Sequence, residues 1–126
     1  MRPVRSLEDA WEFRSRQYRD WLLKDEFTLV VAERDGETIG YAVVSVGEGG
    51  ATWDVGNPVA ELETLSVLES ERGSGVGRAL TEEAQRVASE GGAEAVVVAV
   101  AHTNSDAIRF YEREGFGPFY VLLMKP

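Results

Sequence analysis

The chain has 126 residues, of which 44% are hydrophobic and 28% charged, and this predicts a single folded domain over residues 1–126 with its own hydrophobic core. It contains no cysteine and one histidine, which excludes a disulfide framework and a cysteine nucleophile and argues against a metal site. The net charge of -9 argues against nucleic-acid binding, and no apolar run approaches the roughly 18 residues of a membrane helix, so we expect a cytoplasmic protein that binds neither.

The first half of the chain predicts a helix followed by a β-hairpin. Residues 6–26 place apolar side chains at broadly helical spacing. Residues 27–34 and 37–46 are rich in β-branched side chains, and the Asp35-Gly36 pair between them is a strong signal for a two-residue hairpin turn. Residues 51–59 are interpreted as a variable strand or loop.

The second half predicts alternating strands and helices. Residues 60–68 alternate as a strand does, and residues 76–89 have helical apolar spacing. The continuous apolar run over 95–101 predicts a central strand buried on both faces. A short helix over 104–114 and a last strand over 119–124 complete an α+β domain, or mixed α/β domain, with a strand-helix-strand crossover.

A glycine-rich loop, residues 72–78, joins the strand at 60–68 to the following helix. Its sequence is Arg-Gly-Ser-Gly-Val-Gly-Arg, and glycines let the backbone approach a ligand with its N–H groups turned inward. The helix N-terminus supplies free donors and a partial positive charge, and Arg72 and Arg78 add charge. The loop therefore predicts a phosphate site, with a plain glycine-rich surface turn as the alternative.

Two well-known phosphate loops do not fit these residues. A Walker loop requires lysine after its last glycine, where this chain has Arg78. The dinucleotide pattern requires glycine or alanine at its sixth position, where Arg78 or Leu80 falls in the two registers.

Two motifs resemble the signatures of the GNAT acyltransferases. Arg72-x-x-Gly75-x-Gly77 matches the Q/R-x-x-G-x-G/A motif, after a strand over 61–67 that looks like the family's fourth strand. The segment over 104–116, an asparagine and then a helix ending in Phe-Tyr-x-x-x-Gly-Phe, is similar to the second signature. The resemblance covers residues 60–124 well, and the first 50 residues in coarse pattern alone.

This resemblance implies the GNAT acyl-CoA N-acyltransferase fold. Its central sheet is mixed and mostly antiparallel, splayed between the fourth and fifth strands, and flanked by helices. The N-terminus is short for the family, so the first family strand is either vestigial at residues 3–5 or absent.

The resemblance also implies acetyl-CoA as acyl donor. Pantetheine would enter the gap between the splayed strands and bond the strand backbone, while the N–H groups of residues 72–78 would hold the pyrophosphate. Asn104 would contact the pantetheine arm or its own loop. The implied cofactor-binding residues are Leu65, Ser66, Val67, Arg72, Gly73, Ser74, Gly75, Val76, Gly77, Arg78, Asn104 and Tyr111.

Tyr111 is the candidate general acid. Direct attack of an amine on a thioester expels a thiolate, which a nearby phenol can protonate. Tyr111 occupies the position where many GNAT members place such a tyrosine, and the alternative is a ring that merely packs beside Phe110.

Glu63 is the candidate general base, with an ordered water as the alternative. An ammonium substrate must lose a proton before it attacks. Glu61 and Glu63 share one strand face if no bulge intervenes, and a half-exposed charged residue is an equally good interpretation of Glu63. The run over 95–101 offers no acid.

The remaining candidates are weaker. His102 could relay a proton, although a surface role is favoured. Glu48, Trp53, Asp54 and Tyr120 could line an acceptor pocket, although core or surface roles are favoured for each.

These residues predict an acetyl-CoA-dependent N-acetyltransferase that needs no metal and acts on a primary amine, a small molecule being favoured over a protein. The alternatives are a non-catalytic acyl-CoA-binding sensor or interaction module, and a nucleotide-phosphate binder. The edge of the last strand over 119–124 could pair in a homodimer.

Overall fold

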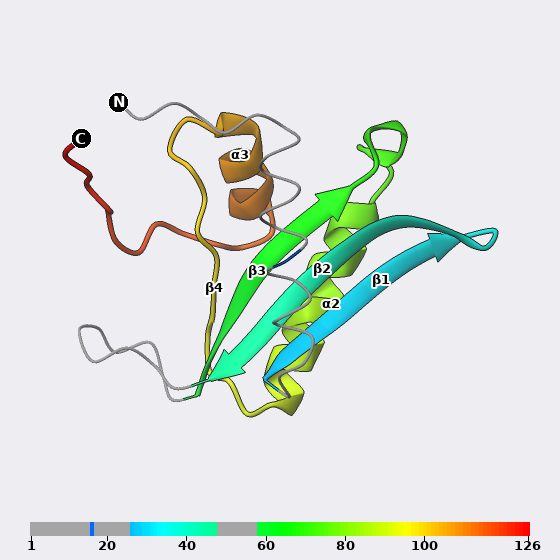
Figure 1. The fold of residues 1–126 in the computed structure, drawn as a ribbon, viewed down its shortest axis with the longest axis horizontal. Helices are drawn as coiled ribbons and strands as arrows, with labels where there is room; N and C mark the ends of the chain where they lie inside the picture. The colour runs from blue at the N-terminus through cyan, green and yellow to red at the C-terminus, as the bar shows by residue number, and fades with distance from the viewer. Residues whose placement is uncertain (1–15, 17–25, 48–57) are drawn as a thin grey trace.

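The computed structural model describes residue 16, residues 26–47 and residues 58–126 (Figure 1). Most of the helix predicted over residues 6–26 lies outside these residues, as does most of the strand or loop predicted over 51–59. The candidate pocket residues Glu48, Trp53 and Asp54 also lie outside them.

The described chain contains a four-stranded mixed sheet in the order β1-β2-β3-β4 (Figure 1). β1 (Phe27–Arg34) and β2 (Glu37–Gly47) form the predicted antiparallel hairpin, and its turn residues Asp35 and Gly36 have φ of 52° and 82°, as a type I′ turn requires.

Two further strands extend this sheet. β3 (Val59–Val67) pairs antiparallel with β2, and β4 (Val96–Val97) pairs parallel with β3. The strands predicted at 27–34, 37–46 and 60–68 are therefore confirmed, with shifts of one residue at most at their ends.

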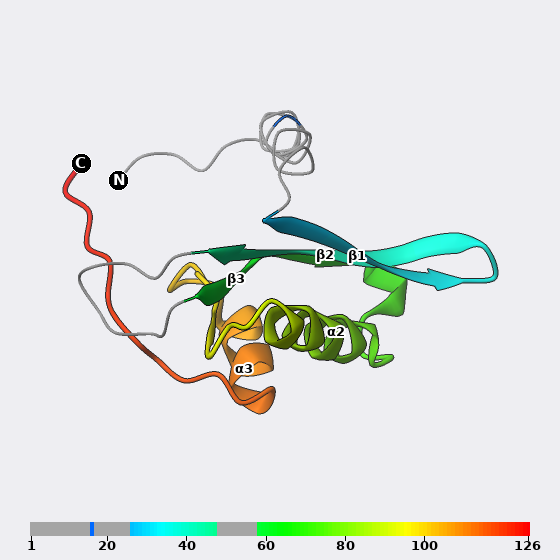
Figure 2. The ribbon, with the colours of Figure 1, turned by 90° about the horizontal axis from the view of Figure 1, so that it is seen from below.

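Two helices lie on the same side of the sheet (Figure 2). α2 (Val76–Glu90) packs against β1, β2 and β3, and α3 (Ser105–Arg113) follows β4. A short 3-10 helix, η1 (Glu69–Glu71), leads from β3 into the glycine-rich loop. The helices predicted over residues 76–89 and 104–114 are thus confirmed. None of the helices described here is long and apolar enough to cross a membrane.

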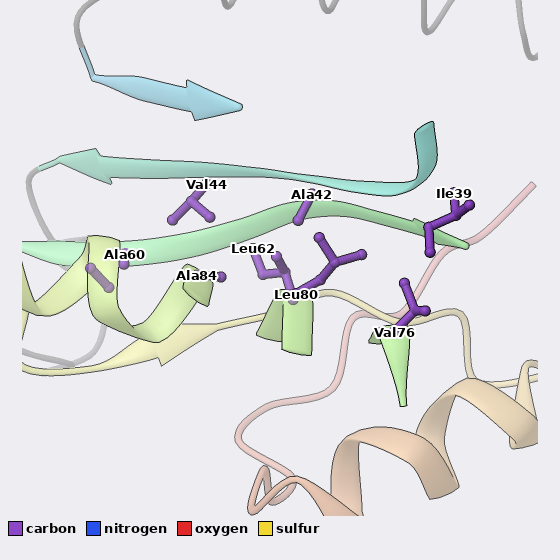
Figure 3. Packing of buried hydrophobic residues seen from close by; sticks show 9 residues of the cluster. Ile39, Ala42, Val44, Ala60, Leu62, Val76, Leu80 and Ala84 are labelled. Atoms are coloured by element: carbon purple, nitrogen blue, oxygen red, sulfur yellow. The ribbon is translucent and has the colours of Figure 1, made fainter. Parts of the chain in front are cut away.

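The hydrophobic core fills the space between the sheet and α2 (Figure 3). Its strand members alternate along β2 and β3, and its helix members recur one turn apart along α2, as burial of one face of each element requires. The buried residues are Ile39, Ala42, Val44, Ala60, Leu62, Val76, Leu80, Ala84 and Ala88.

The central strand predicted over 95–101 is wrong in extent. Val96 and Val97 pair with β3, but residues 98–101 form no strand, and Ala99 and Ala101 are exposed. An extended segment forms a strand only where its backbone N–H and C=O groups are hydrogen-bonded to a neighbouring strand. For β4 that neighbour is β3, and the two strands pair over two residues. An apolar run alone could not reveal this.

The last strand predicted over 119–124 is also wrong. The segment forms no strand, and its hydrophobic side chains are 54% to 86% exposed. Because it does not join the sheet, it gives the far edge of β4 no partner among the described residues.

Candidate functional site

β3 and β4 separate near the middle of β3. Their ladder ends at the pair Glu61–Val97, whereas β3 continues to Val67. The splay predicted between the fourth and fifth strands is therefore present, with β3 as the fourth strand and β4 as the fifth. Beyond the last pair, the edge of β3 that faces β4 is not part of a ladder in the described chain.

A β-bulge at Glu63 lies two residues beyond Glu61, the last position of β3 that is paired with β4. Val43 of β2 pairs with Thr64 and Val44 pairs with Leu62, so Glu63 is the extra residue of β3. A bulge bends its strand and increases the local twist, which explains why β3 leaves β4 at this point.

The bulge also shifts the alternation of β3 by one residue, so that even-numbered residues face the core before it and odd-numbered residues face the core after it. Ala60 and Leu62 point into the core before it, and Leu65 and Val67 pack against the same core after it, while Ser66 is exposed. The side chains of Leu65 and Val67 are thus core residues, and their backbone lies on the diverging stretch of β3, as the sequence predicts.

The loop between β3 and α2 presents unpaired backbone donors at a helix N-terminus. Gly73 and Gly75 have φ of 82° and 91°, a left-handed conformation that favours glycine. The N–H groups of Gly73, Gly75, Val76 and Gly77 donate to no acceptor within the described residues. Such donors at the positive end of α2 are suited to phosphate oxygens, so this backbone fits the pyrophosphate of an acyl-CoA.

Polar side chains flank these donors. Ser74 is turned back into the loop, because its hydroxyl donates to the Glu71 carbonyl. Arg72 is exposed, and Arg78 bonds Glu82 at 3.1 Å in an ion pair whose side chains are 71% and 63% exposed. Exposed pairs of this kind contribute little, so an anion in the loop could draw Arg78 away from Glu82.

Helix α3 carries Tyr111 into the core. Asn104 begins the helix, and its Oδ1 accepts from the Ala107 N–H at 3.1 Å. Tyr111 is half-buried, with its ring edge-to-face with those of Phe110 and Phe116 at centroid distances of 5.2 and 5.4 Å.

The Tyr111 phenol is kept in its protonated form. Burial raises the pKa of Tyr111 above its usual range, because the charged phenolate would lose hydration. No described residue hydrogen-bonds its hydroxyl. A protonated phenol without a protein partner can donate to a leaving group.

Glu61 and Glu63 form a hydrogen-bonded carboxyl pair. Ser45 on β2 donates its hydroxyl to Glu63 Oε1 at 2.8 Å. Burial first, and then the hydrogen bond and negative charge of Glu63, raise the pKa of Glu61 to about 7. Glu61 therefore keeps its proton into the neutral range.

The pair and the phenol belong to opposite sides of the sheet. Ala60 and Leu62 alternate with Glu61 and face α2, so Glu61 points away from α2. Tyr111 packs against the core, and its helix α3 lies on the same side of the sheet as α2 (Figure 2).

Comparison with known proteins identifies the family. The model of the acetyltransferase (GNAT) family matches residues 2–116 of the 126. The chain belongs to this family.

Two curated relatives carry named activities. The mycothiol acetyltransferase of Thermomonospora curvata is 32% identical over 120 residues, covering 93% of this GNAT chain and 37% of that protein. The streptothricin acetyltransferase of Streptomyces lavendulae is 35% identical over 92 residues, covering 73% of this chain and 45% of that protein. The chain thus spans less than half the length of both.

Solved structures share the GNAT fold. The aminoglycoside acetyltransferase AAC(6')-Iy, in complex with the bisubstrate analog CoA-S-monomethyl-acetylneamine, superposes with a TM-score of 0.80. The two are 23% identical, and the match covers 91% of this chain and 78% of that one. At this identity the likeness establishes the mixed sheet and its flanking helices.

The other candidate residues lie away from these groups. His102 is exposed in the turn before α3, and Tyr120 is 59% exposed in the extended C-terminal segment. The described residues contain no cluster of three or more acids and histidines that could hold a metal ion.

Sequence reasoning missed Ser45, which holds Glu63. Ser45 stands in an otherwise apolar stretch of β2, and that polar exception is the signal that could have marked it. Its partner Glu63 depends on the bulged register, which the sequence does not display.

Proposed function

We propose that this GNAT domain transfers an acetyl group from acetyl-CoA to a primary amine. The observation that carries the proposal is the set of unpaired N–H donors at Gly73, Gly75, Val76 and Gly77. They follow a strand whose edge has just left its neighbour, so one ligand could run along β3 and end in the loop. Bound acetyl-CoA supplies the activated acyl group.

Two side chains are assigned to the two proton transfers of the reaction, one as acid and one as base. We assign Tyr111 as the general acid, because its buried phenol is protonated at neutral pH and can protonate the departing thiolate sulfur. We assign Glu63, directly or through an ordered water, as the base that takes a proton from the attacking ammonium. Glu61 lies beside this base, and its own raised pKa lets it hold a proton there into the neutral range.

We infer that the acceptor is a small cationic molecule. The relatives named above are acetyltransferases of mycothiol and of streptothricin, both small molecules. The chain carries a net charge of -9, and the Glu61 and Glu63 carboxyls lie on the face from which we expect the amine to approach.

Thermal unfolding and thiol release test the proposal together. Coenzyme A should raise the melting temperature, since a ligand that binds the folded state alone stabilises it. A panel of small primary amines, including an aminoglycoside and streptothricin, should then release thiol from acetyl-CoA. Stabilisation by coenzyme A without turnover of any amine would favour the acyl-CoA sensor. Stabilisation by ATP and not by coenzyme A would overturn the proposal.

A further inference from the structure

Three elements meet at Gly77. A Cβ added to this residue would lie 3.2 Å from Phe110 Cε1, 3.3 Å from Phe110 Cζ and 3.9 Å from Val67 Cγ2. The edge of the Phe110 ring therefore rests on the α2 backbone at the phosphate loop, next to the end of β3. A side chain at position 77 would have to push the ring aside.

The α2 backbone at Gly77 is held in place by buried neighbours. Thr81, which is 2% exposed, donates its hydroxyl to the Gly77 carbonyl at 2.8 Å. Val76 and Leu80 on either side belong to the buried core. Phe110 thus packs against a fixed part of the molecule.

Helix α3, in contrast, has few attachments. None of its residues is buried, and no other strand or helix of the described chain approaches it over an extended stretch. Phe110 on Gly77 and Tyr111 on the core join it to the sheet and α2. Loss of either would change where the helix lies.

Phe110 and Tyr111 are adjacent, so their side chains leave α3 about 100° apart. One therefore points to the phosphate loop while the other points to the core, and their rings meet edge-to-face at 5.2 Å. Any shift of Phe110 on Gly77 would move the Tyr111 phenol with it.

We propose that Phe110 is a positioning residue, whose contact with Gly77 fixes the Tyr111 phenol relative to the phosphate loop. This inference rests on the proposed function, because it concerns the distance between the pyrophosphate of the donor and the acid that protonates its sulfur. Small displacements of a catalytic group lower the rate steeply, while ground-state binding by the loop backbone need not change.

Kinetics of Phe110→Leu, with acetyl-CoA and the most active amine of the panel, test the proposal. We expect kcat to fall about 10-fold while KM for acetyl-CoA rises no more than about 3-fold. In a Tyr111→Phe background the same substitution should lower kcat less than about 2-fold, since the group that it positions is gone.

Gly77→Ala provides a second approach that leaves Phe110 in place. Its added methyl group should press on the ring and lower kcat, and combining it with Phe110→Leu should restore part of the loss, because the smaller side chain makes room. Gly117→Ala is the matched control: nothing lies within 4 Å of its added Cβ and its φ is not left-handed, so kcat should not change.

The outcomes separate the two proposals. Losses from Phe110→Leu and Tyr111→Phe that multiply would overturn the positioning role and leave the acetyltransferase proposal standing. So would equal kcat values for Gly77→Ala and Gly117→Ala. An unmodified protein that releases no thiol with any amine would overturn both proposals.

Discussion

Glu61 lies half-buried beside Glu63, and both the loss of hydration and the neighbouring negative charge disfavour its ionised form. Its pKa rises from an ordinary value of 4.5 to about 7 on folding. Between these values the folded chain keeps a proton that the unfolded chain releases. The stabilisation from this group is therefore complete below about pH 4.5 and is lost as the pH rises through about 7.

Glu61→Gln removes this titration and keeps a hydrogen-bond donor toward Glu63. We expect the variant to gain stability over the unmodified protein as the pH rises, by about 1–2 kcal/mol between pH 5 and pH 8.5, a value reduced for partial solvent screening. Thermal unfolding at both pH values measures it. Glu112→Gln makes the same change of charge on the exposed face of α3 and should show no such trend. A stability difference independent of pH would contradict the raised pKa of Glu61.

Tyr111→Phe removes the hydroxyl and leaves the packed ring. Because burial keeps the phenol protonated, it can act as the acid at neutral pH, and its removal should lower kcat about 100-fold with little change in melting temperature. Thiol release measures the rate. Glu112→Gln, at an exposed position of the same helix, is the control that should keep full activity. Full turnover of Tyr111→Phe would show that the acid is another group.

Residue-level predictions from the sequence succeeded where the chemistry is local. The glycines of 72–78 and the cap at Asn104 follow from neighbours in the chain, so their conformations could be predicted. Glu61 and Glu63 were predicted to share one face of the strand on condition that no bulge intervened. A bulge does intervene, yet the two side chains still meet, because Glu63 is itself the extra residue. Ser45 and the Phe110–Gly77 contact depend on tertiary register and were missed.

Among the secondary-structure elements, β2 and α2 approach each other closely at Gly40. A Cβ there would lie 3.0 Å from Leu80 Cδ1 and 3.0 Å from the Ser66 carbonyl oxygen. The backbone oxygen cannot move aside without breaking the pairing of β2 with β3. The contact therefore sets the separation of the sheet from its covering helix.

Gly40→Ala should destabilise the protein by about 1–3 kcal/mol, as overpacking of a filled core does. Gly47→Ala is the matched control at the other end of β2, since nothing lies within 4 Å of its added Cβ and its φ is not left-handed. Urea unfolding of both variants measures the difference. Equal midpoints would show that the sheet and α2 have room to separate.

The elements show why sequence patterns predict some strands and miss the limits of others. The hairpin of β1 and β2 carries its turn signal and both partners within one short stretch, so the pattern contained the whole structure. The run over 95–101 and the segment over 119–124 are equally apolar, but a strand also needs an edge to pair with. For the run over 95–101 that edge ends where the pairing of β3 with β4 stops, at Glu61, and the apolar pattern does not encode this.

For the whole molecule, the fold class followed from the order of elements together with two motifs. The mixed sheet, the crossover through α2 and the splay between β3 and β4 are all present. The acceptor did not follow, because the segments expected to surround it include residues 48–57, which lie outside the described structure, and the exposed C-terminal segment. The net charge of the chain is the remaining property that can distinguish one class of acceptor from another.

A net charge of -9 should attract cationic acceptors and repel the anionic donor. Raising the salt concentration from about 10 to 200 mM shortens the range of both effects, because the Debye length falls from roughly 30 to less than 10 Å. For an aminoglycoside with several ammonium groups, kcat/KM should therefore fall about 3- to 10-fold over this range. For acetyl-CoA, kcat/KM at saturating amine should stay level or rise. Steady-state kinetics with a monoamine of similar size provide the control, since one charge should give a smaller decline. Equal salt dependence for the two amines would mean that the acidic surface does not select the acceptor. Selection would then come from the contacts that the amine makes inside the site.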